Sequence, residues 1–164
     1  MMTTTETRAA RSGRLTGMRL LLLTVALVVA GADLTAKAAA QRFLSPGRVV
    51  NLGPLDLRLV YNPGTAFSLG AALPAPLIAT SIAIVVAGVA VFAWRAAPHA
   101  ALLMVLGLAS ILGGAVANLI DRLRDRVVTD YLYSSWWPTF NLADVFITVG
   151  AVAVLISTLR TPRG

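Results

Sequence analysis

The sequence has few charged side chains and few of the residue types that perform covalent or metal chemistry. Its 164 residues include seven acids, one lysine, one histidine and no cysteine. Without cysteine, disulfides, thiolate nucleophiles and cysteine-ligated metals are excluded. A single histidine excludes a multi-histidine metal site within the chain, and a Ser-His-Asp triad would have to use His99. We therefore expect neither a metal nor any other cofactor.

Charged residues make up 13% of the sequence, whereas 57% of the residues are hydrophobic. Soluble domains average about 45–50% apolar and about 25% charged residues. The composition excludes an ordinary soluble globule or a disordered chain, and it favours several membrane-spanning helices. The basic residues are spread thinly, with no basic block interleaved with aromatic residues. We therefore expect contact with membrane lipid and none with nucleic acid.

Four apolar segments are long enough to cross a bilayer as helices. They cover residues of about 18–40, 75–94, 100–120 and 140–159, and about 20 apolar residues span the hydrocarbon layer. Between the first two segments, Leu55, Leu57, Leu59 and Tyr61 alternate as in a short strand. The predicted fold class is an all-α membrane protein. It is a four-transmembrane-helix bundle with a small extracytoplasmic β-containing segment between spans one and two.

The N-terminal region allows two interpretations. Residues 1–17 are predicted to form a basic, disordered tail, and residues 18–160 a single membrane domain. The basic lead, the apolar run and Ala30-Gly31-Ala32 resemble a cleavable signal peptide. A retained helix is favoured because apolar and small residues continue past that point. In addition, Asp33 and Lys37 lie four residues apart, where they can pair on one helix face.

The number of basic residues does not decide the orientation in the membrane. Four spans place both termini on one side, and each side then carries seven basic residues. Four arginines precede the first span, and the first helix usually dominates orientation. We therefore expect cytoplasmic termini.

Ionisable groups within or beside membrane spans are costly, and are usually paired or functional. Asp33 and Lys37 form one such set, either as an ion pair that fixes the end of the first helix or as chemically active groups. Asn118, Asp121 and Arg122 form a second set on one face at the end of span three. The preceding Gly113 and Gly114 predict close helix contact or close substrate approach.

The third set comprises Asp130, in the last loop, and Asn141 and Asp144 at the start of span four. Asp144 could simply be a helix-start acid that the helix dipole favours. Alternatively, Asp130 and Asp144 form a carboxylate dyad, in which one carboxyl holds a proton and the other activates water. Since cysteine and a multi-histidine metal site are excluded, this dyad is the best hydrolytic machinery in the chain.

Five sequence motifs follow one another along the chain: Asp33-x-x-x-Lys37, residues 61–68 (YNPGTAFS), 113–122 (GGAVANLIDR), 127–131 (VVTDY) and 140–144 (FNLAD). Together they resemble the motifs of the bacterial lipoprotein signal peptidase (signal peptidase II) family. Each motif alone is weak, but five in the right order over about residues 18–160 are specific.

The resemblance implies an intramembrane aspartic endopeptidase of the bacterial inner membrane, with its active site near the extracytoplasmic face. Such enzymes cut diacylglyceryl-modified prolipoproteins just before the lipidated cysteine, and we expect this chain to act as a monomer. By the resemblance, Asp130 and Asp144 are the catalytic pair. The implied substrate-binding and supporting residues are Asn62, Asn118, Arg122, Asn141, Asp33, Lys37, Asp121 and Gly114. Residues 41–74 correspond to the family's small sheet and mobile lid.

Several positions depart from the family's usual pattern without removing a carboxylate. Ala117 and Arg126 stand where glycine is usual, Thr65 replaces an alanine, Thr129 an apolar residue, and Val145 a serine.

Two other classes of function remain open from the residues alone. A channel or transporter subunit would use the same acids for ion or proton passage. A serine-dependent signal peptidase would need a Ser–Lys pair, but no serine stands at a diagnostic spacing from Lys37, the only lysine.

Overall fold

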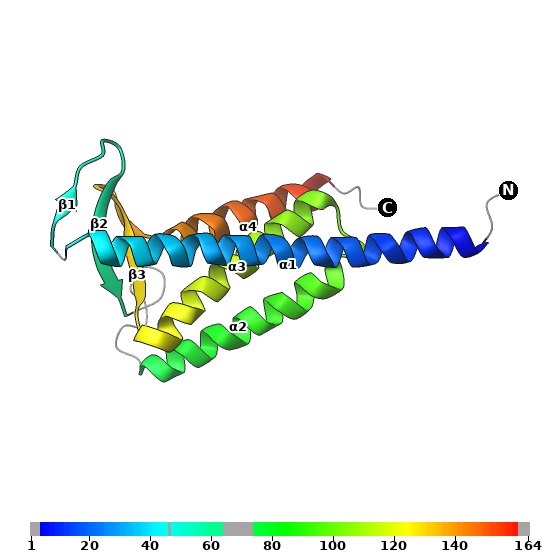
Figure 1. The fold of residues 1–164 in the computed structure, drawn as a ribbon, viewed down its shortest axis with the longest axis horizontal. Coiled ribbons are helices and arrows are strands. Elements are labelled where there is room, and N and C mark those ends of the chain that lie inside the picture. Colours follow the sequence, from blue (N-terminus) through cyan, green and yellow to red (C-terminus); the bar gives the residue numbers. More distant parts are fainter. Residues whose placement is uncertain (1–3, 46, 64–73, 161–164) are drawn as a thin grey trace.

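The protein is a bundle of four long helices with a small sheet at one end (Figure 1). A computed structural model describes residues 4–45, 47–63 and 74–160. The helices are α1 (Thr4–Phe43), α2 (Ala75–Ala96), α3 (Leu102–Asp125) and α4 (Leu142–Arg160). All four are long and apolar enough to cross a membrane. This confirms the four predicted spans, and the starts of α2, α3 and α4 lie within two residues of the predicted ones.

The first helix is longer than its predicted span. It begins at Thr4, so residues 4–17, which the sequence predicts to be a disordered tail, continue the helix. Extending an existing helix avoids the cost of nucleation, and alanine and arginine are good helix formers. The N-terminal part of α1 reaches beyond the other helices in Figure 1. The motif residues from Gly64 to Ser68, including Thr65, lie outside the described residues.

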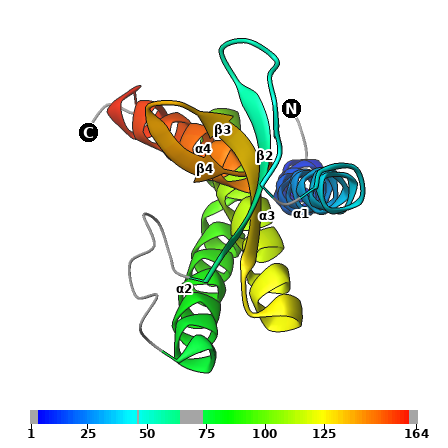
Figure 2. The same ribbon diagram turned by 90° about the vertical axis from the view of Figure 1, so that its left-hand side faces the viewer.

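The four strands form one antiparallel sheet in the order β1-β2-β3-β4. The strands are β1 (Val49–Val50), β2 (Asp56–Asn62), β3 (Val128–Ser134) and β4 (Trp137–Phe140). The strand predicted around residues 55–61 is therefore confirmed. However, the β-structure is not confined to the segment between spans one and two, because β3 and β4 come from the link between α3 and α4. We call the end of the bundle that carries the sheet the sheet end. Figure 2 views the molecule from this end and shows the β1–β2 hairpin projecting past the helices.

Helix α3 lies at the centre of the bundle and contacts the other three helices. Glycines allow two of these contacts to be very close. A Cβ added to Gly113 would lie 2.5 Å from the carbonyl oxygen of Ala26 in α1. A Cβ added to Gly114 would lie 2.7 Å from the carbonyl oxygen of Ala143 in α4. The sequence left two uses open for these glycines, and the structure shows close helix contact.

The C-terminal end of α3 sets the direction of β3. Arg126 is the C-cap residue, with φ 63° and ψ 4°, and its backbone N–H donates to the carbonyl of Arg122. This left-handed conformation is the one that glycine adopts most easily. It explains physically why glycine is usual at this position, and it lets the chain turn from α3 into β3.

Candidate active site

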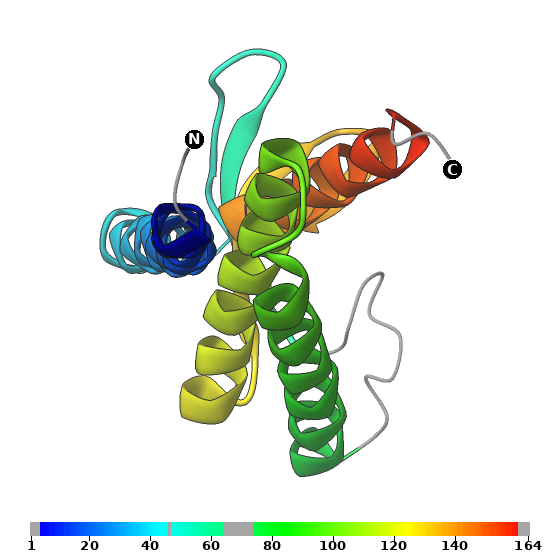
Figure 3. The same ribbon diagram turned by 90° about the vertical axis from the view of Figure 1, so that its right-hand side faces the viewer.

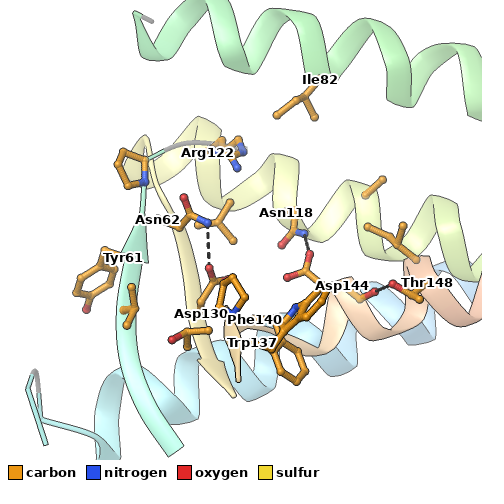
Figure 4. Close-up of a pocket in the computed structure, with 17 residues that line it drawn as sticks. Tyr61, Asn62, Ile82, Asn118, Arg122, Asp130, Trp137, Phe140, Asp144 and Thr148 are labelled. Carbon is orange, nitrogen blue, oxygen red and sulfur yellow. Dashed lines mark hydrogen bonds between the residues drawn. The ribbon is translucent and has the colours of Figure 1, made fainter. Parts of the chain in front are cut away.

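A cavity of about 900 Å³ lies where the sheet meets the helices (Figure 4). Its polar wall carries Asp130 from β3, Asp144 from α4, Asn62 from β2, and Asn118 and Arg122 from α3. Its apolar wall includes Ile82 of α2, Ala115 of α3, Ile147 of α4, and Trp137 and Phe140 of β4. Six elements from distant parts of the sequence therefore surround one space that contains two carboxylates.

Asp144 belongs to the first turn of α4. The backbone N–H of Asp144 donates to Asn141 Oδ1 over 3.0 Å, and the backbone N–H of Asn141 donates to Asp144 Oδ2 over 3.2 Å. These reciprocal bonds form a capping box, in which Asn141 is the N-cap and Asp144 is the third helical residue. Asp144 is thus the helix-start acid that the sequence suggested, and it also faces the cavity.

Asp130 lies near the middle of β3, with only 3% of its surface exposed. Asn62 Nδ2 donates to its Oδ2 over 3.1 Å, and Asn141 Nδ2 donates to its Oδ1 over 2.7 Å. Burial, with a smaller contribution from the charge of Asp144, raises the pKa of Asp130 to about 6. A buried carboxyl beside another carboxylate therefore holds its proton more readily than a free aspartic acid does.

Two asparagines connect the carboxylates. Asn118 Nδ2 donates to Asp144 Oδ1 over 3.0 Å, as Figure 4 shows. Asn141 Nδ2 donates to Asn118 Oδ1 over 3.2 Å as well as to Asp130. The side chain of Asn141 is therefore shared between the groups of Asp130 and Asp144. This arrangement fixes which face of each carboxylate meets the cavity.

Lys37 lies behind this network and is almost completely buried. Its Nζ is 2.8 Å from Asp33 Oδ2 and 3.1 Å from Asp121 Oδ2, and it donates to Asn118 Oδ1 over 2.7 Å. The predicted Asp33–Lys37 pair is confirmed. Since Lys37 and Asn141 both donate to the oxygen of Asn118, the amide nitrogen of Asn118 is directed at Asp144.

Asp33 and Asp121, the two acidic partners of Lys37, also hold the backbone next to Asp144 and Asp130. Asp33 Oδ1 accepts the backbone N–H of Ala143 over 2.8 Å, next to Asp144. Asp121 Oδ2 accepts the backbone N–H of Thr129 over 3.1 Å, next to Asp130. Asp121 thus points at α1 and β3, whereas Asn118 and Arg122, predicted to share its face, line the cavity.

The structure also shows contacts that the sequence did not predict. Gln41 Nε2 donates to Thr129 Oγ1 over 2.8 Å, so the unusual threonine beside Asp130 has a polar partner from α1. The hydroxyl of Tyr131 accepts the backbone N–H of Leu142 over 3.3 Å, and burial raises the pKa of Tyr131 to about 12. No local pattern in the sequence indicates either contact, because the partners lie 88 and 11 residues apart.

Most of the predicted site residues are brought together in one hydrogen-bonded cluster around the two carboxylates. Gly114 contributes differently, since it packs α3 against α4 and is not among the residues that line the cavity. His99 lies in the α2–α3 link, and the described Ser81 and Ser110 donate to carbonyls of their own helices. Among the described residues, therefore, neither a histidine triad nor a Ser–Lys pair forms.

Known proteins resemble this chain over most of its length. A family profile described as signal peptidase (SPase) II matches residues 25–160. The lipoprotein signal peptidase of Rhodococcus jostii (strain RHA1) is 38% identical over 149 residues, covering 86% of this chain and 73% of that protein. The one of Mycobacterium leprae (strain Br4923) is 39% identical over 147 residues, covering 83% and 70%.

The fold also has a known counterpart. A solved structure of a bacterial membrane enzyme matches with a TM-score of 0.74 at 22% sequence identity, covering 87% of this chain and 94% of that one. This supports the same arrangement of four helices and a sheet. From the profile and these relatives, we conclude that this chain belongs to the signal peptidase II family, a family of proteases.

Proposed function

We propose that the protein is an intramembrane aspartic endopeptidase that removes signal peptides from diacylglyceryl-modified prolipoproteins, cutting just before the lipidated cysteine. The observation that carries this proposal is the pair Asp130 and Asp144, which line one cavity and both accept from Asn141, Asp130 from its side-chain Nδ2 and Asp144 from its backbone N–H. The names of its relatives, lipoprotein signal peptidases, support the substrate class. We further propose a bacterial inner-membrane location, cytoplasmic termini and a monomeric enzyme.

The apolar wall of the cavity suits a membrane-embedded substrate. Ile82, Ala115 and Ile147 come from three different spanning helices, and the carboxylates lie at their sheet end. The apolar segment of a signal peptide would pack along these side chains. Its C-terminal end would then lie beside Asp130 and Asp144, on the extracytoplasmic side of the membrane.

In the proposed mechanism, Asp144 is the ionised carboxylate, because it lies at a helix N-terminus and accepts two amide N–H groups. It takes a proton from a water molecule, whose oxygen attacks the scissile carbonyl carbon. In the reactive form of the enzyme, Asp130 is protonated, as its raised pKa of about 6 favours, and it donates a hydrogen bond to the developing oxyanion. The C–N bond then breaks, and the amine nitrogen receives the proton that Asp144 had taken.

The test is to assay cleavage of a lipidated precursor by Asp130→Asn and Asp144→Asn separately. Because each carboxyl has its own step, each variant should lose activity by about 10²–10⁴-fold. Asp125→Asn is the matched control, since Asp125 is exposed and lies 3.9 Å from Arg124, outside the cavity. Substantial turnover by a folded Asp130→Asn or Asp144→Asn variant would contradict the proposal.

Two further measurements distinguish the proposed function from the two other classes of function. A serine-dependent signal peptidase would also cut the unlipidated precursor, whereas the proposed enzyme should require the lipid. If the acids served ion or proton passage, depletion of the protein would not cause uncleaved prolipoprotein to accumulate.

A further inference from the structure

A second hollow lies far from the carboxylates, between α1 and α2. It has a volume of about 440 Å³ and is lined by Leu22, Leu23, Ala90, Val91, Trp94, Arg95 and Leu112. We call it the α1–α2 groove. It lies toward the end of the bundle that carries the α2–α3 link and the termini, which we call the terminal end. Figure 3 views the molecule from this end.

The lining of the groove is suited to a hydrocarbon chain. Leu22 and Leu112 are buried and form its base, whereas Leu23 and Val91 remain 42% and 50% exposed at its sides. All these residues belong to helices that can span a membrane. An exposed apolar groove between two spans faces the acyl chains of the bilayer.

One end of the groove is cationic and aromatic. The guanidinium of Arg19 lies 4.7 Å from the ring centroid of Trp94, and its Nε donates to the Trp94 carbonyl over 3.4 Å. Arg95, the next residue, lines the groove itself. Tryptophan and arginine together are typical of the level where lipid headgroups begin.

The protein supplies few carboxylates at this end. Under the four-span topology, the side of the termini carries seven basic residues and one acid, Glu6, whereas the other side carries seven basic residues and six acids. Neither Arg19 nor Arg95 forms an ion pair within the part of the chain that the structure describes. Glu6 is 13 residues before Arg19 on α1, about 20 Å along the helix. Among the described residues, therefore, no carboxylate neutralises these two arginines, and an anion from the surroundings can bind them.

We propose that the α1–α2 groove is a binding site for an anionic phospholipid of the leaflet on the side of the termini. One acyl chain lies along Leu23 and Val91, and the phosphate of the headgroup binds Arg19 and Arg95. Arginine suits this role, because its planar guanidinium binds phosphate oxygens in pairs and stays charged. Basic side chains at an anionic membrane surface contribute about a fivefold increase in affinity each, or roughly 25-fold for two.

Trp94 can serve as the reporter of this site. The chain has three tryptophans, and the other two, Trp136 and Trp137, belong to the sheet end. In a Trp136→Phe, Trp137→Phe background, the fluorescence of Trp94 would be measured in vesicles containing brominated phosphatidylglycerol or brominated phosphatidylcholine. At equal mole fractions, the anionic lipid should quench Trp94 more strongly, with a relative affinity higher by about 10-fold or more.

The affinity for phosphatidylglycerol relative to phosphatidylcholine should fall to nearly one in the Arg19→Gln, Arg95→Gln double variant. The preference should persist in Arg160→Gln, a matched control that removes a basic residue from the same end but from α4. Inorganic phosphate added to the vesicles should not displace the lipid, since the acyl chain contributes to binding. Equal quenching by the two lipids in the arginine-containing protein would overturn the proposal, and this comparison does not depend on any arginine variant folding. Preference retained by the double variant would overturn the assignment of the two arginines.

Discussion

Gly114→Ala should lower catalytic activity by shifting Asp144 relative to α3, although both aspartates remain in the sequence. The new Cβ would lie 2.7 Å from the backbone oxygen of Ala143 and 2.9 Å from Ile147 Cγ1. Ordinary contacts of this kind begin near 3.4 Å, so α3 and α4 would have to separate by about 0.7 Å at this point. A backbone atom cannot rotate away as a flexible side chain can.

The separation acts directly on the hydrogen bond between Asn118 and Asp144. Asn118 is one helical turn after Gly114 on α3, and Asp144 follows Ala143 on α4. Their 3.0 Å bond would lengthen to about 3.7 Å, beyond the range of a hydrogen bond. A displacement of about 1 Å at a catalytic group can cost 10²-fold, so we expect a 10- to 100-fold loss of cleavage rate. Overpacking should also cost about 1–3 kcal/mol of stability.

Two other glycines give matched controls for the cleavage assay and for thermal unfolding in detergent. Gly107→Ala creates an equal clash between the same helices, 2.7 Å from the Gly150 oxygen, but away from the site. It should lose similar stability and less activity. Gly88→Ala meets nothing within 4 Å and should be neutral or slightly stabilising. A Gly114→Ala enzyme that cleaves at the normal rate, or a Gly107→Ala enzyme that is equally impaired, would refute the reasoning.

Three further perturbations test the surrounding structure. Arg126→Gly should raise the free energy of unfolding by about 1 kcal/mol, because glycine adopts the left-handed C-cap without strain; an unchanged unfolding midpoint would contradict this. Since the folded pKa of Asp130, about 6, exceeds the unfolded value near 4, its ionisation disfavours folding. Stability should therefore fall by about 2–3 kcal/mol between pH 4 and pH 7 in the wild type, measured against Asp130→Asn, in which this component should disappear. Lys37→Met leaves Asp33 and Asp121 buried without their cation and should destabilise by about 3–5 kcal/mol in the same unfolding assay, whereas retained stability would show that the cluster needs no charge.

The helices could be predicted from the sequence because a bilayer leaves the backbone little choice. Segments near 75–94, 100–120 and 140–159 had to be helical once they were apolar over a membrane's thickness. The strands β3 and β4 were not predicted, because the sequence analysis placed Asp130 and its neighbours in a loop between spans three and four. Their pairing depends on β2, for example Val60 with Asp130, which is 70 residues away. No local periodicity encodes such a partner.

In the candidate site, too, contacts within one helix could be predicted from the sequence, whereas contacts between distant segments could not. The spacing of Asp33 and Lys37 predicted their ion pair, because four residues make one helical turn. The spacing of Asn141 and Asp144 placed them at a helix start but did not reveal that Asn141 also reaches Asp130. Asn62 and its bond to Asp130 came only from the family resemblance, because a loop asparagine in an isolated sequence has many possible partners.

The pairing of Asp33 with Lys37 also bears on how the protein can be inserted into the membrane. The N-terminal helix is synthesised first, so α1 reaches the bilayer before α3 and α4 can offer Asp121, Asn118 or the Ala143 amide. An isolated charge in α1 would then oppose insertion. Because the partners are 2.8 Å apart on the same helix, Lys37 brings its own counter-ion, and the Asp33–Lys37 pair enters the membrane as a neutral unit. The groups that later hold the carboxylates in register thus impose little cost on the earliest step of biogenesis.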